Sequence, residues 1–350
     1  MSADQPPDLV REARRQEQDN DGDSQEQQPP SASAAAQPLP SPSAAGALAP
    51  ESEAQAGRHE EYQYLDLVSL VLSQGVRRAD RTGTGTRALF GHLSRYSLSG
   101  GQVPLLTTKR VFWRGIVGEL LWFLRGRTDA ALLSAQGIKI WEANASRAAL
   151  DARGFTHRRQ GDLGPVYGFQ WRHFGAKYLD CDTDYSGQGV DQLAQVIRMI
   201  REEPESRRIV MTAWNPCDLP LMALPPCHCF LQFFVDTGCR QLSCMLTQRS
   251  ADLGLGVPFN LASYGLLTHL IARVTDLTPG FLVHSIGDAH VYSDHESQLR
   301  VQLTRTPNPF PRISIDVPIQ SLTDIEALTI EDIRLVGYDP HPAIHLPMSV

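Results

Sequence analysis

The stretch His228-Cys-Phe-Leu-Gln-Phe-Phe-Val-Asp-Thr-Gly-Cys-Arg-Gln-Leu-Ser-Cys-Met-Leu-Thr-Gln248 decides the fold class of this 350-residue chain. Residues 228–236 and 241–248 have the composition of strands, and the turn-like run Asp236-Thr-Gly-Cys239 separates them. This pattern predicts two strands joined by a tight connection. The alternation of Ile209, Met211 and Ala213 predicts another strand before them, and residues 281–286 predict one after them.

Helices are predicted on both sides of these strands. Apolar residues with a helical period favour helices over 61–74, 113–125, about 261–274 and 294–304. A short helix is expected between Thr128 and Gly137, and another after Asp191 as its cap, limited by Pro204. Because helices and strands are mixed without a regular βαβ alternation, we expect a single α+β domain with a large mixed β-sheet covered by helices. The large strand face also needs cover, and a second subunit is a candidate.

The charge of the chain is concentrated at its N-terminus. Residues 1–57 hold three Arg and ten acidic residues, which accounts for the whole net charge of −7, so residues 58–350 are neutral on average. The N-terminal segment is rich in Gln, Pro, Ser and Ala and lacks apolar periodicity, so we expect a disordered acidic tail before an ordered domain over 58–350. The neutral average gives no support to nucleic-acid binding.

The six cysteines favour reduced thiols. The chain is large, and no export signal or membrane-spanning apolar run is apparent, so we expect a cytoplasmic protein, with the nucleus as an alternative, and no membrane partner. The spacing of Cys227, Cys229, Cys239 and Cys244 lacks paired C-x-x-C knuckles and so does not favour zinc. We therefore expect no metal.

The run Ala223-Leu-Pro-Pro-Cys227-His228 is the sharpest local feature, because two prolines fix the backbone before a Cys at the start of a strand. A thiol acts as a nucleophile only as its thiolate, which needs positive charge nearby. The candidate cations are Arg81, Arg207, Arg208 and Arg249. The alternatives are a buried structural thiol and arginines that face solvent; Arg207-Arg208 would then be a solvated pair at a helix end.

Other polar residues stand in apolar company. Burial of Glu119 inside Gly118-Glu-Leu-Leu-Trp122 would raise the pKa of its carboxyl and suit it to proton transfer, unless an arginine pairs with it. Asn260 either caps the helix after it or reads a pyrimidine edge with its amide. His290 and Tyr292 point the same way on an extended segment and suit a sugar hydroxyl, or are ordinary core polar residues. The Gly-rich turn after Arg81 and the run Gln248-Arg249-Ser250 suit phosphate.

Together these features resemble thymidylate synthases from about residue 60 to 350. The matching runs are Asp80-Arg-Thr-Gly-Thr-Gly-Thr86, Leu105-Leu-Thr-Thr-Lys-Arg-Val-Phe-Trp113, Asp162-Leu-Gly-Pro-Val-Tyr-Gly-Phe-Gln-Trp-Arg172, Asp184-Tyr-Ser-Gly-Gln-Gly189, Leu221-Met-Ala-Leu-Pro-Pro-Cys-His228, Gly254-Leu-Gly-Val-Pro-Phe-Asn260 and Gly287-Asp-Ala-His-Val-Tyr292. Long ordered matches of this kind are more specific than any one Gly-rich loop. The resemblance implies a methyltransferase that converts dUMP to dTMP, with 5,10-methylenetetrahydrofolate as the source of carbon and hydride.

The resemblance also implies a role for each matching residue. Cys227 would add to C6 of the uracil ring. Glu119 and His228, with ordered water, would handle protons, Tyr167 would help remove the C5 proton, and Asn260 would select uracil. The residues implied for dUMP binding are Arg81, Gln248, Arg249, Ser250, Asp252, His290 and Tyr292, with Arg207 and Arg208 donated by the partner of a homodimer. The folate-facing set is Ile140, Trp141, Asn144, Asp252, Leu255, Gly256 and Phe259.

The chain departs from the family pattern near these residues. Glu142 stands where Asp is usual, Cys217 replaces Arg, and Ala251 replaces Gly. Met245 and Thr247 replace Gln and Tyr, and the C-terminus reads Pro347-Met-Ser-Val350. None of these changes deletes a group that does chemistry, so we expect an active enzyme in which folate affinity is affected most.

Two other functions are compatible with the same scaffold. A pyrimidine nucleotide hydroxymethylase would use a similar site, although Asn260 favours uracil over cytosine. A non-catalytic RNA-binding relative would have no need of the combination of Cys227, Glu119, Tyr167 and Asn260.

Overall fold

The computed structural model describes residues 57–348 of the chain. The expected disordered tail, residues 1–57, lies outside the described residues except for Gly57. Within 57–348, no helix combines the length and apolar character that crossing a bilayer requires.

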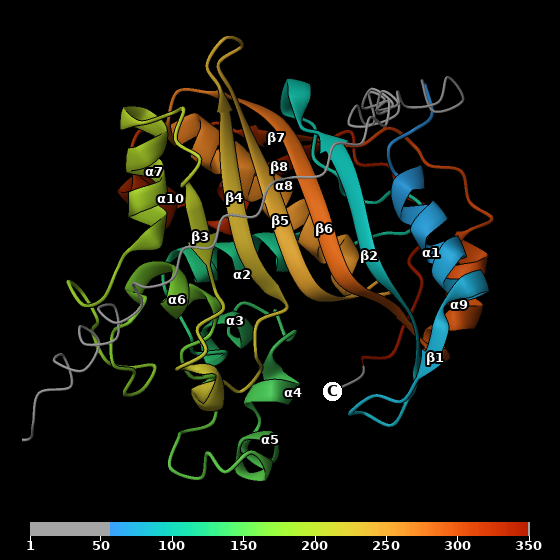
Figure 1. Cartoon of the computed structure of the whole chain (residues 1–350), viewed down its shortest axis with the longest axis horizontal. Coiled ribbons are helices and arrows are strands. Elements are labelled where there is room, and N and C mark those ends of the chain that lie inside the picture. The colour runs from blue at the N-terminus through green and yellow to red at the C-terminus, as the bar shows by residue number, and fades with distance from the viewer. Residues whose placement is uncertain (1–56, 349–350) are drawn as a thin grey trace, which may run out of the picture. The chain divides into compact units, whose positions relative to one another are not determined.

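A six-stranded mixed sheet forms the centre of the described domain (Figure 1). Its order is β1 (Val76–Arg78), β2 (Thr86–Ser97), β6 (Thr278–Tyr292), β5 (Gln241–Asp252), β4 (His228–Asp236) and β3 (Val210–Thr212). β5 and β6 run parallel and the other neighbours are antiparallel. A separate antiparallel pair is formed by β7 (Arg312–Ile315) and β8 (Ile333–Val336). The predicted α+β class with a large mixed sheet is confirmed.

The helices cover one side of the sheet (Figure 1). The longer ones are α1 (Tyr62–Gln74), α2 (Trp113–Leu124), α6 (Tyr167–His173), α7 (Gln192–Glu202), α8 (Gly256–Val274) and α9 (Glu296–Gln302). Shorter ones are α3 (Ala131–Ser134), α4 (Glu142–Ala145), α5 (Arg147–Ala152) and α10 (Leu322–Ala327). The predicted cap is confirmed, because the Asp191 side chain accepts a hydrogen bond from the backbone N–H of Ala194.

Two boundaries differ from the sequence prediction. α8 begins at Gly256 rather than near 261, so Asn260 lies inside the helix and does not cap it. The capping interpretation of Asn260 is therefore wrong. β6 is longer than 281–286 at both ends, and β2, which pairs with it along most of its length, was not predicted. Each strand carries a glycine in its interior: Gly91 of β2 has a φ of +87°, and a Cβ on Gly287 of β6 would lie 2.9 Å from the Arg249 carbonyl oxygen.

The two faces of the sheet have different neighbours. α2 and α8 lie behind the sheet in Figure 1, and the inward side chains Leu231, Phe233 and Leu246 are buried against that layer. Outward side chains of the sheet stay exposed: Phe234 of β4 by 67% and Leu93 of β2 by 59%. We call the first side the inner face and the second side the outer face.

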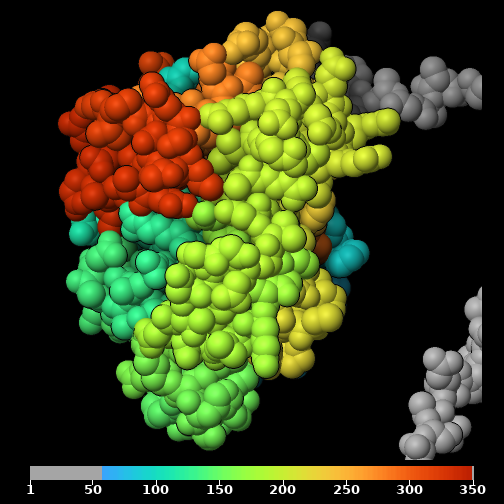
Figure 2. All heavy atoms as spheres, turned by 90° about the vertical axis from the view of Figure 1, so that its left-hand side faces the viewer, coloured from blue at the N-terminus to red at the C-terminus, as the bar shows by residue number. Residues whose placement is uncertain are grey.

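The C-terminal part of the domain packs beside α7. Figure 2 shows the two regions, red and yellow-green, in contact on one flank of the molecule. Arg201 of α7 donates to the Gln320 carbonyl at 3.0 Å, and Arg172 of α6 bridges Asp191 and Glu326 at 2.9 and 2.6 Å. These contacts fix α6, whose first residue is Tyr167, behind the start of β4.

Candidate active site

Cys227 lies directly before β4, as the proline pair predicted. Its backbone N–H donates to the Tyr167 hydroxyl at 2.8 Å, and its carbonyl accepts from the backbone N–H of Arg249 at 3.1 Å. The Arg249 guanidinium holds the carbonyls of Pro225 and Pro226, and its Nη2 lies 3.7 Å from the Cys227 sulfur. The proline turn, β5 and α6 therefore converge on one thiol.

Two opposing effects act on the Cys227 thiol. Burial raises its pKa, and the nearby Arg249 and Arg81 lower it. Burial has the larger effect, so the pKa of the Cys227 thiol lies above its usual value. The arginines act in the direction predicted from the sequence, but they do not by themselves make a stable thiolate.

Glu119 lies in α2 and is only 8% exposed. Its carboxylate accepts a hydrogen bond from the Trp141 indole at 2.8 Å, and within residues 57–348 no arginine forms an ion pair with it. Burial raises the pKa of Glu119 to about 7, against the smaller opposite effect of the indole. The predicted buried carboxyl with a raised pKa is therefore present, and it can both give and take a proton near neutral pH.

Tyr167 connects the thiol to the aromatic part of the site. Its ring lies 4.9 Å from the His228 ring and 6.0 Å from the Trp141 ring. Burial raises the pKa of Tyr167 well above its usual value, so the hydroxyl is neutral. A neutral hydroxyl that accepts from the Cys227 N–H can still donate its own proton to a water or a ligand.

Asn260 and His228 are joined by a hydrogen bond of 2.8 Å between Asn260 Nδ2 and His228 Nε2. Asn260 Oδ1 accepts from Gln248 Nε2 at 3.1 Å, and His228 Nδ1 lies 3.0 Å from the Tyr264 hydroxyl. Burial lowers the pKa of His228 to about 3, so the imidazole is neutral. Asn260 keeps one N–H and one oxygen lone pair for a ligand.

The phosphate candidates are only partly assembled within one chain. Arg249 and Ser250 lie on β5, and Arg81 is exposed in the loop between β1 and β2 yet acts electrostatically on Cys227. The Gly-rich turn folds around Asp80, whose carboxylate accepts from the Thr82 N–H at 2.9 Å. That N–H is therefore not available to an external anion.

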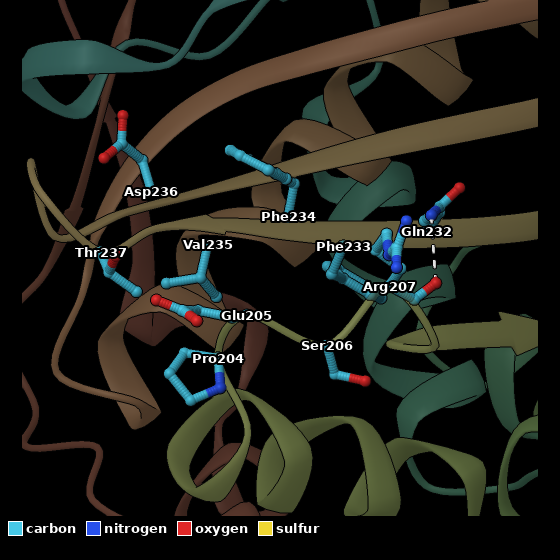
Figure 3. Close-up of a pocket in the computed structure, with 10 residues that line it drawn as sticks. All are labelled: Pro204, Glu205, Ser206, Arg207, Gln232, Phe233, Phe234, Val235, Asp236 and Thr237. Carbon is cyan, nitrogen blue, oxygen red and sulfur yellow. Dashed lines mark hydrogen bonds between the residues drawn. The ribbon is translucent and has the colours of Figure 1, made fainter.

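Arg207 and Arg208 are exposed in the segment between α7 and β3. Figure 3 shows Arg207 beside the outward residues of β4, where Gln232 Nε2 donates to the Arg207 carbonyl at 3.5 Å. This segment and β4 line a hollow of about 370 Å³. No contact within residues 57–348 joins either arginine to Cys227, so the structure does not bring them into the site of their own chain. They also follow α7 after a gap rather than forming its end.

The sugar candidates lie on β6. His290 and Tyr292 are half-buried, their rings are 5.3 Å apart, and they point the same way as predicted. His290 Nδ1 lies 3.0 Å from the Asp288 carboxylate. Asp252 pairs with His290 across the sheet and accepts from the N–H groups of Gly254 and Leu255 at 2.8 and 3.1 Å.

The folate-facing candidates lie in two groups. Asp252, Leu255, Gly256 and Phe259 stand at the junction of β5 and α8, and Ile140, Trp141 and Asn144 stand around the start of α4. The C-terminal segment reaches the first group through His295, whose Nε2 donates to the Pro347 carbonyl at 2.7 Å and whose Nδ1 lies 3.8 Å from the Asp252 carboxylate, beyond hydrogen-bond distance.

Comparison with known proteins decides the family. A family model described as thymidylate synthase matches residues 62–350. The thymidylate synthase of equine herpesvirus 2 is 59% identical over 292 residues, which cover 83% of this chain and 99% of the viral protein. Those of Homo sapiens and Saccharomyces cerevisiae are each 56% identical over 83% of this chain and over 91% and 97% of their own lengths. This chain belongs to the thymidylate synthase family.

Two departures from the thymidylate synthase pattern lie away from the folate-facing residues. Met245 and Thr247 lie on the outer face of β5, where Met245 pairs with Gln232 and Thr247 with Phe230. Cys217 and Glu142 are exposed, and Ala251 is buried. Ser349 lies outside the described residues. The positions of Met245 and Thr247 make the outer face, rather than folate binding, the place where we now expect their effect.

The sequence prediction missed residues that hold the site from behind. Tyr264 and His284 are buried and extend the Asn260 hydrogen bonds on either side, and His295 anchors the C-terminal segment. Each is a polar residue in an otherwise apolar helix or strand, and that contrast was the available signal.

Metal-ligand chemistry occurs away from this site. Asp129, Cys181 and Asp182 lie close enough to share an ion, but Arg159 already bridges the two carboxylates at 2.9 and 2.7 Å. All six cysteines lie within residues 57–348 and are free thiols.

Proposed function

We propose that this chain converts dUMP to dTMP by reductive methylation, with Cys227 as the nucleophile. The observation that carries the proposal is the placement of the Cys227 thiol between Arg249, Tyr167 and the Asn260–His228 pair. A thiol, cations and a pyrimidine-reading amide in one place suit addition to a uracil ring that carries a phosphorylated sugar.

The first step is addition of the Cys227 sulfur to C6 of the uracil ring. The S–C6 bond forms, the C5=C6 electron pair moves toward O4, and the thiol proton leaves to water. Because burial raises the pKa of the Cys227 thiol, this proton transfer is part of the barrier, and Arg249 and Arg81 lower it. C5 then carries the electron density that forms the new carbon–carbon bond.

Proton transfers around the ring fall to Glu119 and Tyr167. Glu119, with a pKa of about 7, is poised to protonate an oxygen or nitrogen through ordered water and to recover that proton. Tyr167 stays neutral and assists removal of the C5 proton as a hydrogen-bonding group rather than as a phenolate. Neutral His228 keeps the charge of the pocket low and holds Asn260.

Recognition of uracil falls to Asn260. Its free oxygen lone pair would accept from uracil N3–H, and its free N–H would donate to O4. Cytosine presents the opposite pattern at these two positions. This favours the methylase over a hydroxymethylase that acts on cytosine nucleotides.

The residues present fit a reduced folate. Asp252 keeps lone pairs for ring N–H groups after accepting two backbone bonds, and Trp141, Leu255 and Phe259 offer apolar surface for a flat ring. 5,10-Methylenetetrahydrofolate, when bound, supplies the one-carbon unit and a hydride and becomes dihydrofolate. The S–C6 bond breaks at the end, which returns Cys227 to its starting state.

We also propose that the active unit is a homodimer formed through the outer face. Leu93 of β2, Val210 of β3, and Phe230 and Phe234 of β4 are exposed apolar residues of the outer face, and Arg207 lines the same hollow as Phe234. A surface of this kind is typical of protein interfaces. Arg207 and Arg208 are exposed and do not contact the site of their own chain. In a homodimer they would bind the phosphate in the partner's site.

The nucleophile is tested with 5-fluoro-dUMP and methylenetetrahydrofolate. Fluorine at C5 cannot leave as a proton, so the adduct should accumulate on the Cys227 peptide and be seen by mass spectrometry. Cys229→Ala should still form the adduct, and Cys227→Ala should not. An adduct on another cysteine would overturn the assignment.

The shared site is tested by mixing two inactive variants. Cys227→Ala lacks the nucleophile, and Arg207→Ala/Arg208→Ala lacks the donated cations. A heterodimer of the two contains one site with both defects and one intact site, so mixing after mild dissociation should restore part of the activity. No restoration, although heterodimers form, would contradict donation across the interface.

A further inference from the structure

We propose that His284 is a positioning residue that sets the choice of uracil over cytosine, a proposal that rests on the function proposed above. His284 lies on β6, is 1% exposed, and stands behind Gln248 rather than beside Cys227. It would act by fixing which way the side-chain amides of Gln248 and Asn260 point.

Four hydrogen bonds connect His284 to the far side of the site. His284 Nε2 lies 2.6 Å from Gln248 Oε1, Gln248 Nε2 donates to Asn260 Oδ1 at 3.1 Å, and Asn260 Nδ2 donates to His228 Nε2 at 2.8 Å. His228 Nδ1 then lies 3.0 Å from the Tyr264 hydroxyl. In this series of four hydrogen bonds, every donor points in the same direction, from His284 toward Tyr264.

One residue must fix the donor direction of this hydrogen-bond series, because most of its members can exchange donor and acceptor roles. The oxygen and nitrogen of an Asn or Gln amide exchange places by a half-turn, a neutral imidazole can carry its proton on either nitrogen, and a hydroxyl both donates and accepts. If both amides turned over, the same side chains could make the same number of bonds in the opposite direction. Asn260 would then offer its nitrogen where it now offers its oxygen.

His284 favours one direction because its other nitrogen has no partner. Nδ1 of His284 is buried and without a hydrogen-bond partner among residues 57–348. A buried N–H with no acceptor is costlier than a bare lone pair, so the proton belongs on Nε2. A donor at Nε2 requires the oxygen of Gln248 opposite it, which turns the Gln248 nitrogen toward Asn260 and the Asn260 nitrogen toward His228.

Other groups beside these hydrogen bonds give weaker support to the same donor direction. Gln248 Nε2 also lies 3.4 Å from the Ser250 carbonyl, a long contact that favours the same amide orientation. Burial and the neighbouring His228 and His92 lower the pKa of His284 to about 3, so the ring is neutral and carries a single N–H. The short bond of 2.6 Å from His284 is therefore the main constraint.

Reversal of Asn260 would reverse what it recognises. In the present direction its free groups suit the N3 donor and O4 acceptor of uracil, and after reversal they would suit the N3 acceptor and N4 donor of cytosine. His284 would thus determine the choice between uracil and cytosine without contacting the pyrimidine.

The test compares dUMP and dCMP binding in His284→Phe and His284→Gln. Phe keeps a flat ring without a donor, and the Gln side-chain nitrogen can replace the Nε2 donor. In His284→Phe we expect dUMP to bind about tenfold more weakly, and the ratio of the Kd values for dCMP and dUMP to fall by about tenfold or more. His284→Gln should recover most of that ratio. If His284→Phe does not fold, His284→Met removes the donor in a more flexible side chain.

The readout separates a specificity role from a structural one. A merely structural His284 would lower the melting temperature of both variants and leave the dCMP to dUMP ratio at the wild-type value, and that result would overturn the proposal. Wild-type protein that does not prefer dUMP would contradict the proposed function itself. Wild-type preference that persists unchanged in His284→Phe contradicts only the inference about His284.

Discussion

The inner and outer faces of the sheet use the same strands for opposite purposes. On β5, Gln248 points inward, is 1% exposed and is bonded on both sides, whereas its neighbour Thr247 points outward beside Phe230. The inner face contains polar groups that apolar surroundings would destabilise unless each had a partner. The outer face contains apolar groups that water surrounds.

The difference shows where each face obtains its missing contacts. Polar residues of the inner face find partners within the chain, so the site is organised before any ligand arrives. Apolar residues such as Phe234 and Leu93 remain 67% and 59% exposed among the described residues, and a second subunit would cover them. Changes on the inner face should therefore alter chemistry, and changes on the outer face should alter assembly.

The largest effect is expected for Glu119→Gln on the inner face. The amide keeps the shape and can still accept from Trp141, but it cannot transfer a proton. We expect kcat to fall by about 10² to 10⁴-fold with little change in dUMP binding. The matched control is Glu331→Gln, which changes an exposed carboxylate in a surface ion pair and should leave kcat within about twofold. Equal kcat values for the two variants would remove Glu119 from the chemistry.

Phe234→Glu on the outer face should act on assembly. A charge in the centre of an apolar interface has no partner, so we expect the dimer dissociation constant to rise at least about 100-fold. Sedimentation equilibrium measures this, and activity should follow the dimer fraction. Leu179→Glu is the control, since Leu179 is also an exposed apolar residue (59%) but lies outside the sheet. A stable, active Phe234→Glu dimer would exclude this face as the interface.

The pH dependence of the free energy of unfolding should report the raised pKa of Glu119, which lies on the inner side of the sheet. Glu119 has a pKa of about 7 in the folded protein and 4.5 in its ordinary state, so the folded protein holds an extra proton between these values. The free energy of unfolding should fall as pH rises from 4.5 to 7, by up to about 3 kcal/mol, and then level off. Glu119→Gln should lack this loss, so it should gain stability relative to wild type over that window. A difference between the two proteins that stays constant with pH would contradict the raised pKa.

The smallest effect is expected outside both faces. Deletion of residues 1–57 removes an acidic segment that the sequence assigns no part in the site, so kcat should stay within about twofold of the full chain. A large loss of kcat, with the shortened protein still folded, would show that the tail contributes to turnover.

The sequence predicted the fold class and most of the site for different reasons. The hairpin and α7 follow from local signals, the alternation after Cys227 and the cap at Asp191, which act within a few residues. β2 escaped prediction because its alternation is interrupted at Gly91, which has a φ of +87°, and because its pairing with β6 is a long-range contact. The start of α8 was misplaced because Pro258 and the glycines near it resemble a turn.

The roles around Cys227 could be inferred only partly from the sequence. The resemblance to the family named Cys227, Glu119, Tyr167 and Asn260, and the structure places three of them in one hydrogen-bonded or ring-contact set with His228. His284 belongs to no motif that signals its role in the sequence, because that role depends on contacts between β5, β6 and α8. The pKa of the Cys227 thiol could not be predicted from the sequence either, because burial and nearby charge oppose each other and only the folded structure shows which effect is larger.

Formation of dihydrofolate tests the central claim most directly. Purified protein mixed with dUMP and methylenetetrahydrofolate should show the absorbance change of dihydrofolate, only when dUMP is present, and Cys227→Ala should show none. A folded dimer that binds dUMP yet forms no dihydrofolate, or a Cys227→Ala variant that still forms it, would contradict the account.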